Sequence, residues 1–203
     1  MSVLIATSSA DKLREIRSLL GGPVPWLVCL DDLPGVPAPP AEPFDSFRAN
    51  ALHKARWYAR VTGLNSLADD SGLRVDALGG APGVRSRRFA ADATGGVAGD
   101  TDAANNRLLL ERLQGVPFER RTARYVCAAA FAAANGPALA ALATCPGVIL
   151  QHERGRLGFG YDPLFLLPDV GRSFAELTPA EKQRCSHRAR AFRALASSLP
   201  PRR

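Results

Sequence analysis

The feature that most restricts the fold of this chain is an uncharged stretch from Tyr125 to Leu150, rich in alanine, valine and leucine. Asn135-Gly136-Pro137 interrupts it, and Pro146-Gly147 interrupts it again. Each piece is therefore too short to cross the roughly 30 Å hydrocarbon core of a membrane as a helix. Because Asn-Gly is a hairpin turn signal, we expect two buried antiparallel strands, 124–134 and 138–150, and no membrane span.

The rest of the chain predicts a mixed α/β fold. Val3 to Ala6 and Ser66 to Ala68 are typical of short buried strands, the second ending on Asp69-Asp70. Asp45 or Ser46 can cap a helix that runs to Thr62. With 203 residues, no repeat and no detachable segment, we expect one domain, 1–203, built on a mixed sheet with flanking helices, in two lobes.

The helix ending at Thr62 carries its expected buried stripe at Phe47, Ala51, Ala55 and Tyr58. Asn50 and Lys54 lie three residues beyond members of that stripe, so both are expected beside it, tethered and partly buried.

Three further helix starts follow from capping residues. Asp100 or Thr101 can cap a helix through Leu113, and Thr178-Pro179-Ala180-Glu181 is a capping box with proline at the first helical position. Ser186 can cap a final helix, whose expected inward residues are Phe192, Leu195, Ala196 and Leu199.

Charge and cysteine content limit the classes of partner. The net charge of +7 favours polyanions such as nucleic acid, acidic membranes or phosphorylated small molecules, although compositional drift towards arginine gives the same number. Four scattered cysteines without a Cys-x-x-Cys pair, and only three histidines, argue against a zinc site. The N-terminus enters a strand-like run without a leader, so reduced thiols and a cytoplasmic location are expected.

The first candidate site is the polar loop between the first strand and the first helix. Such loops bind phosphate in α/β proteins because helix N-termini present free N–H groups. This loop comprises Thr7, Ser8, Ser9, Ala10, Asp11 and Lys12. It lacks a P-loop or dinucleotide fingerprint, so a plain helix cap is the alternative.

The second candidate is Asp69-Asp70-Ser71-Gly72, interpreted as a turn at a strand end. Adjacent carboxylates repel each other unless a cation or hydrogen bonds hold them. They suit a Mg²⁺ site and a base for an attacking water, with an Asx turn around a positive-φ Gly72 as the alternative. Because successive strand side chains face opposite ways, Asp69 and Asp70 cannot share one role.

The third candidate is Gly158-Phe159-Gly160-Tyr161-Asp162-Pro163, followed by Lys182 and Ser186-His187-Arg188. Glycines around Phe159 and Tyr161 allow an aromatic platform for a flat base, whereas core aromatics are the alternative. Lys182 can join His187 and Arg188 only if the helix breaks near Cys185-Ser186.

Taken in order, these segments resemble the inosine-triphosphate pyrophosphatases, or XTP/dITP diphosphatases, across nearly the whole chain. The resemblance rests on Ile5-Ala6-Thr7 to Glu15, Asn50 to Ala55, Ala68 to Leu73, Gly80 to Val84, Gly158 to Phe165, Glu176-Leu177-Thr178, Glu181-Lys182 and Ser186 to Arg188. The chain departs from the family pattern in Thr7-Ser8-Ser9, where Thr-Gly-Asn is usual, and also at Ala49 and Arg85.

The resemblance implies hydrolysis of a purine nucleoside triphosphate to the monophosphate and pyrophosphate, with Mg²⁺, by a homodimer whose site lies in a cleft between two lobes. It implies that Asp70 binds the metal and accepts the proton and that Glu42 joins the metal site. From its place at the edge of its helix, we expect Lys54 to act in catalysis. The resemblance assigns phosphate to the loop 7–12. The implied substrate-binding residues are Ser71, Phe159, Gly160, Tyr161, Asp162, Lys182, His187 and Arg188.

We therefore expect ITP, dITP and XTP as substrates, because a 6-oxo purine accepts hydrogen bonds from His187 or Arg188 while adenine presents a donor. Lys12, Lys54 and Lys182 would offset the charge of the triphosphate. Two alternatives remain: a Maf-like pyrophosphatase for other modified nucleotides, and a basic nucleic-acid-binding protein. No stable nucleic-acid or membrane partner is expected, because the basic residues are spread along the chain.

Overall fold

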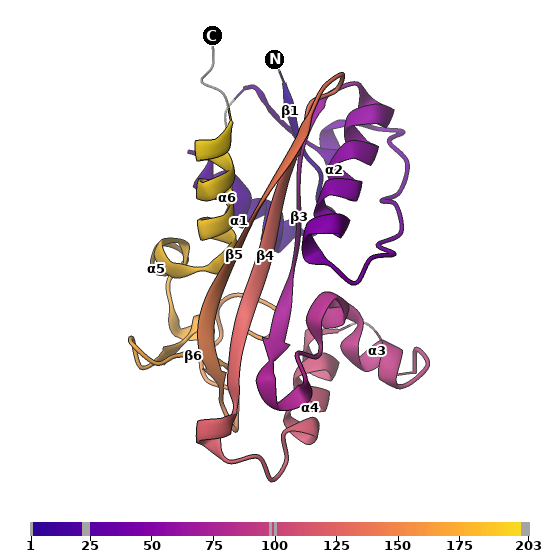
Figure 1. Ribbon diagram of the computed structural model, residues 1–203. Coiled ribbons are helices and arrows are strands. Elements are labelled where there is room, and N and C mark those ends of the chain that lie inside the picture. Colours follow the sequence, from indigo (N-terminus) through magenta and orange to yellow (C-terminus); the bar gives the residue numbers. More distant parts are fainter. Residues whose placement is uncertain (1, 22–24, 98, 100, 200–203) are drawn as a thin grey trace. The chain divides into compact units, whose positions relative to one another are not determined.

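The computed structural model describes residues 2–21, 25–97, 99 and 101–199 (Figure 1). In this part of the chain seven strands form one sheet with the order β2-β1-β3-β4-β5-β6-β7. The strands are β1 (Val3–Ile5), β2 (Leu27–Cys29), β3 (Asn65–Val75), β4 (Thr122–Ala132), β5 (Ala138–Ile149), β6 (Phe165–Leu167) and β7 (Arg172–Ser173). The α-helices are α1 (Ala10–Leu19), α2 (Phe47–Thr62), α3 (Phe89–Ala93), α4 (Asp102–Arg112), α5 (Pro179–Cys185) and α6 (His187–Ser198).

The sheet is mixed, which confirms the predicted fold class. β1 pairs in parallel with β2 and with β3, so that Leu4 lies opposite both Val28 and Ser66. β6 pairs antiparallel with β5 and with β7. The β4–β5 connection closes with a hydrogen bond from the Ala133 amide to the Pro137 carbonyl, 3.0 Å long, which confirms the predicted hairpin.

The chain divides into two compact units, and β3, β4 and β5 each give one end to each unit. The first unit comprises residues 1–70, 127–143 and 187–203, and the second comprises 71–126 and 144–186. The assignment of 1–203 to one domain with a cleft between two lobes stays a prediction.

Each unit has its own apolar core. In the first, Ile16 of α1 and Phe192 and Leu195 of α6 pack with Ile5 and Leu67 of the sheet. In the second, the core is aromatic as well as aliphatic, with Tyr125, Tyr161, Phe165 and Phe174 packed together. None of the helices among the described residues is long and apolar enough to cross a membrane.

Local sequence signals fixed several helix ends as predicted. The Ser46 hydroxyl accepts from the Ala49 amide at the start of α2, and Gly63 ends that helix in the left-handed conformation. Thr178 and Glu181 form the expected capping box of α5. Thr101 caps α4, whereas the alternative cap, Asp100, lies outside the described residues.

Three structural expectations are wrong. β3 does not end at Asp69-Asp70 but continues to Val75, so Asp69 to Gly72 is mid-strand and not a turn. β5 is less buried than expected: Leu142 is half exposed, and only Cys145, Gly147 and Ile149, near the end of the strand, are buried. Ala196 is exposed, since α6 turns a different stripe inward.

Gly72 has an extended strand conformation, and its lack of a side chain allows residues 83–86 to approach β3 closely. A Cβ atom there would lie 2.4 Å from Ser86 Oγ and 2.5 Å from the Gly83 carbonyl oxygen. Ser86 in turn accepts a hydrogen bond from the Leu73 amide, 2.8 Å long. The 3₁₀ helix Gly83–Arg88 can therefore pack on β3 only where no side chain stands in between.

We expect Gly72→Ala to lower the free energy of unfolding by about 1–3 kcal/mol, the usual cost of overpacking. Gly136→Ala is the control, because its nearest contact would be the Ala133 methyl at 3.1 Å, with no backbone atom within 4 Å, and its φ is not in the left-handed region. Urea denaturation measures both, and equal stability of the two variants would contradict the close approach.

Candidate active site

Asp69 and Asp70 are consecutive residues of β3 that have opposite surroundings. Both are buried, with 1% and 5% of their surface exposed. Because strand side chains alternate, the Asp69 carboxylate contacts α1 and α6 whereas that of Asp70 contacts α2. The two carboxylates therefore have different surroundings, as strand alternation predicts, and their separate roles stay a prediction.

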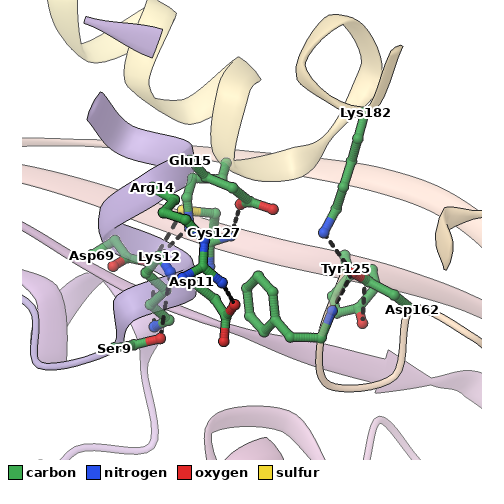
Figure 2. Close-up of polar contacts among 12 residues, drawn as sticks. Ser9, Asp11, Lys12, Arg14, Glu15, Asp69, Tyr125, Cys127, Asp162 and Lys182 are labelled. Atoms are coloured by element: carbon green, nitrogen blue, oxygen red, sulfur yellow. Dashed lines mark hydrogen bonds and ion pairs between the residues drawn. The ribbon is translucent and has the colours of Figure 1, made fainter. Parts of the chain in front are cut away.

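Asp69 is the counter-ion of buried cations. Its Oδ2 lies 3.3 Å from Lys12 Nζ and 3.3 Å from Arg188 Nε, and Figure 2 shows it beside Lys12. Lys54 Nζ donates to the Asp69 backbone carbonyl over 3.1 Å. Burial alone would raise the pKa of Asp69, but the charges of Lys12, Arg188 and Lys54 outweigh it and lower this pKa. Asp69 is therefore ionised throughout the physiological pH range.

Arg188 is held from two sides in the same cluster. It is 1% exposed and also forms an ion pair with Glu15 of α1. Burial would lower its pKa, but Asp69 and Glu15 raise it, so the guanidinium stays charged. Cys127 lies against Asp69, and burial together with that negative charge raises the pKa of its thiol. Cys127 is thus a neutral packing group and not a nucleophile.

Asp70 is oriented by a buried amide. Asn50 Nδ2 donates to Asp70 Oδ2 over 3.1 Å and to the Phe44 carbonyl over 2.9 Å, and Asn50 Oδ1 accepts from the Phe44 amide. Asn50 therefore ties the loop after Glu42 to α2 and to β3. Burial, and then the negative charge of Glu42, raise the pKa of Asp70 to about 6.

Glu42 and Lys54 complete the surroundings of Asp70. Lys54 forms an ion pair with Glu42, and its side chain is only 13% exposed. Burial would lower the pKa of Lys54, but Glu42, Asp69 and Asp70 outweigh it and raise this pKa. The prediction that Lys54 is partly buried beside the α2 stripe is confirmed.

The donor set of Asp70 and Glu42 fits a hard divalent cation. Carboxylate oxygens are the ligands that Mg²⁺ prefers, and the repulsion that raises the pKa of Asp70 is what a cation would relieve. No cluster of three or more His, Cys, Asp or Glu residues able to hold a metal occurs in the described part of the chain. Mg²⁺ commonly needs only one or two protein carboxylates, because waters and substrate phosphates supply the other ligands.

The loop 7–12 forms the start of α1. Ser9 is the N-cap, and its Oγ accepts from the Lys12 amide over 3.3 Å. Thr7 Oγ1 accepts from the Ser9 amide over 3.2 Å, Ser8 is exposed, and Asp11 forms an ion pair with Arg14. Ser9 is therefore a helix cap, as the alternative interpretation predicted. The N-terminus of α1 still lies after β1, the position expected of a phosphate site.

A second cluster, in the second unit, centres on Asp162, which is 2% exposed. Its Oδ2 accepts from Lys182 Nζ over 2.5 Å and from the Phe159 amide over 2.9 Å (Figure 2). Lys182 Nζ also lies 4.8 Å from the centroid of the Phe159 ring. The Asp162 carboxylate thus holds both Phe159 and Lys182, the aromatic residue and the cation that are expected to bind substrate.

Two glycines allow the backbone of this loop to approach the carboxylates of Asp162 and Asp102. Gly158 has a φ of 77°, and a Cβ there would lie 2.0 Å from Asp162 Oδ2. The Gly160 amide donates to Asp102 Oδ2 of α4 over 2.6 Å. The backbone of the loop is therefore clamped by Asp162 on one amide and by Asp102 on the next.

Tyr161 is a correction to the expected aromatic platform. Its side chain belongs to the core of the second unit, is 4% exposed, and donates its hydroxyl to the Ser86 carbonyl over 2.7 Å. Tyr161 turns inward because its ring packs in this core and its hydroxyl bonds to the Ser86 carbonyl. Only Phe159, which is half-buried, keeps the position of a stacking residue.

The predicted helix break is confirmed. α5 ends at Cys185, Ser186 is extended with a ψ of 152°, and α6 begins at His187, which is 3% exposed. Lys182 is placed with Asp162, and Arg188 with Asp69 and Glu15. The meeting of Lys182 with His187 and Arg188, and the binding role of Ser71 beside Asp70, stay predictions.

Three residues of these clusters escaped the sequence analysis. Glu15 follows Lys12 by three positions, so the helical period of α1 could have placed it on the same face. Tyr125 and Asp102 had no such signal, because they lie 37 and 58 positions from the loop residues that they contact.

Comparison with known proteins identifies close relatives. A model of the Ham1 family matches residues 3–198. A dITP/XTP pyrophosphatase of Geobacillus kaustophilus is 45% identical over 193 residues, covering 94% of this chain and 90% of that protein. One of Nocardia farcinica is 48% identical over 201 residues, covering 97% and 94%. The solved structure of a HAM1 protein from Coxiella burnetii is 37% identical, with a TM-score of 0.84 and 98% coverage of both chains.

We expect Asp69→Asn and Asp70→Asn to change stability in opposite directions in metal-free buffer at pH 8. Asp69→Asn removes the counter-ion of Lys12 and Arg188 and should cost about 3–5 kcal/mol. Asp70→Asn removes a carboxylate whose pKa of about 6 lies above its ordinary 3.8, a difference worth about 3 kcal/mol, and should stabilise the protein by up to that amount.

The destabilising effect of Asp70 should also appear in how the free energy of unfolding depends on pH. Below about pH 3 Asp70 is protonated in the folded and the unfolded chain, and as the pH rises from there to about 6 the unfolded chain loses the proton first. Wild type should therefore lose about 3 kcal/mol relative to Asp70→Asn across that window, and nothing further above it. Urea denaturation from about pH 3 to 8 with a chelator measures this, and parallel curves for the two proteins would refute it.

Proposed function

Because this chain belongs to the Ham1 family, we propose that it is a nucleoside-triphosphate pyrophosphatase that hydrolyses ITP, dITP and XTP to the monophosphate and pyrophosphate. Relatives named dITP/XTP pyrophosphatase match it over nearly its whole length. The observation within the molecule that carries the proposal is Asp70, a buried carboxylate with a pKa of about 6, set between a second carboxylate and two lysines.

We assign Mg²⁺ to Asp70 and Glu42 on the chemistry of these donors. When bound, this cation would supply positive charge to the phosphates and acidify a coordinated water. The protein's own residues do the rest of the positioning. Asn50 fixes the plane of the Asp70 carboxylate, and Lys54 neutralises Glu42 so that the site does not repel a triphosphate.

Asp70 is also assigned the role of proton acceptor for the water that attacks the α-phosphorus. In the metal-free protein the pKa of about 6 marks Asp70 as the more basic of the two adjacent aspartates. Asp69 cannot serve this way, because its charge is already committed to Lys12 and Arg188. The two adjacent carboxylates thus divide into a structural and a chemical member.

Lys12 and the start of α1 are assigned to the phosphates. Helix N-termini attract anions through their free amides. Lys12 adds a positive charge that is 20% exposed, so it can reach solvent and ligand while remaining paired with Asp69. The charge leaving with pyrophosphate would be stabilised by these groups.

The base is assigned to Phe159, His187 and Arg188. Lys182, which the sequence placed among the cations that offset the triphosphate, is assigned to the base instead, because its ammonium lies 4.8 Å from the centroid of the Phe159 ring. A ring such as Phe159 stacks with any base, so it does not select among purines. Buried donors select a 6-oxo group, because the 6-amino group of adenine would leave donor facing donor, at a cost of about 1–3 kcal/mol, or about 5- to 150-fold. A homodimer, a cytoplasmic location and the lack of a stable nucleic-acid partner are proposed with the same function.

The proposal is tested by pyrophosphate release from ITP, dITP, XTP, GTP, ATP and TTP with Mg²⁺. We expect the first three to have the highest kcat/KM and a chelator to abolish activity. Asp70→Asn should lower kcat at least about 100-fold, the usual contribution of a positioned acid–base group.

Asp76→Asn is the matched control, because Asp76 is an exposed aspartate directly after β3 that pairs with Arg124. It should keep wild-type kcat. Preference for other modified nucleotides would favour the Maf-like alternative, and salt-sensitive DNA binding without hydrolysis would favour the nucleic-acid-binding one.

A further inference from the structure

Tyr125 places a polar atom in the aromatic core of the second unit. Its ring stacks on Phe174 with a centroid distance of 5.6 Å and an interplanar angle of 7°, and lies 4.6 Å from the ring of Phe165. A phenylalanine would fill this space equally well. The hydroxyl is thus not needed for packing. It requires a hydrogen-bond partner, because a buried hydroxyl without one costs stability.

That partner is Asp162, the carboxylate that holds the substrate-binding loop. The Tyr125 hydroxyl donates to Asp162 Oδ1 over 3.3 Å. The other oxygen, Oδ2, accepts from Lys182 and from the Phe159 amide. Three donors therefore share the two oxygens of one buried carboxylate, and the contact to Oδ1 restrains rotation of the group about its Cβ–Cγ bond.

We propose that Tyr125 is a positioning residue for purine recognition: its hydroxyl holds Asp162 in the orientation that keeps Lys182 and the Phe159 ring in place. The inference rests on the proposed function, because it requires that Phe159 and Lys182 contact the base. It adds a residue of β4 to the recognition of the base, through the hydrogen bond to Asp162 and not through contact with the base.

Two observations support an action through Asp162. Burial, and then the negative charge of Asp162, raise the pKa of Tyr125, so its hydroxyl remains a donor at every pH at which the enzyme would work. Lys182 Nζ lies 4.8 Å from the Phe159 ring and 5.5 Å from the Phe174 ring on which Tyr125 stacks. Direct contacts therefore link the Tyr125 hydroxyl through Asp162 to Lys182 and the Phe159 ring.

Tyr125→Phe is the test, because it removes the hydroxyl and keeps the stacked ring. We expect KM for dITP to rise about 3- to 10-fold, the range for one lost hydrogen bond, with kcat within about twofold of wild type. The inhibition constant of inorganic tripolyphosphate, which has no base, should not change. A larger tripolyphosphate constant or an unchanged KM would overturn the proposal.

A double-variant cycle separates positioning from general loosening of the core. If the hydroxyl acts through the carboxylate, as proposed, Tyr125→Phe should add nothing to the loss caused by Asp162→Asn. Additive losses in the cycle would show that Tyr125 acts by another route and would overturn the proposal.

Amide hydrogen exchange tests the inference without reference to activity. In Tyr125→Phe the Phe159 amide, which donates to Asp162, should exchange faster, whereas the Leu157 amide, which donates to the Ala175 carbonyl, should not. Equal acceleration of both amides, or of neither, would contradict positioning. If wild type released no pyrophosphate from dITP, the proposed function would fail, and the exchange rates would still decide whether Tyr125 holds the loop.

Discussion

The first unit depends on one buried negative charge, the carboxylate of Asp69. It is surrounded by Lys12 of α1, Arg188 of α6 and the ammonium group of Lys54 from α2. A buried ion of this kind is tolerated only while its partners stay in place, so the three helices and β3 are fixed together by charge as well as by packing. Glu15 extends the constraint, because it holds Arg188 from α1. The position of the loop 7–12 and the direction of Asp70 both follow from this arrangement.

The chemistry we propose depends on the contrast between two neighbouring aspartates. Strand alternation turns Asp69 towards cations and Asp70 towards a second carboxylate, so that the pKa of one is lowered and that of the other is raised to about 6. Separation of the pKa values of like groups by their surroundings is how proteins obtain acid–base chemistry at neutral pH. A single backbone feature, the continuation of β3 through both residues, produces the separation.

Much of the fold followed from local signals. The caps Ser46, Gly63 and Thr178 and the Asn135-Gly136 turn specify ends and reversals through hydrogen bonds within a few residues, and the structure has them as predicted. The Asp69 to Gly72 turn was wrong because Gly72 is required by Ser86, a contact that no local pattern contains. The inward Tyr161, and the roles of Tyr125 and Asp102, likewise arise from partners distant in sequence. Sequence thus predicted the candidate groups, and tertiary contacts decided which of them are structural.

The central claim is that Asp69 is permanently ionised while Asp70 is the carboxylate that responds to protons and to metal. Carbon-13 NMR of the side-chain carboxyl groups, followed against pH, measures both residues in one sample, and Asp70→Asn assigns the signals. Without Mg²⁺ we expect an Asp70 pKa of about 6 and an Asp69 pKa below its ordinary value. Added Mg²⁺ should lower the pKa of Asp70 and leave Asp69 unchanged. Titration of both residues near pH 4, or a metal response confined to Asp69, would contradict it.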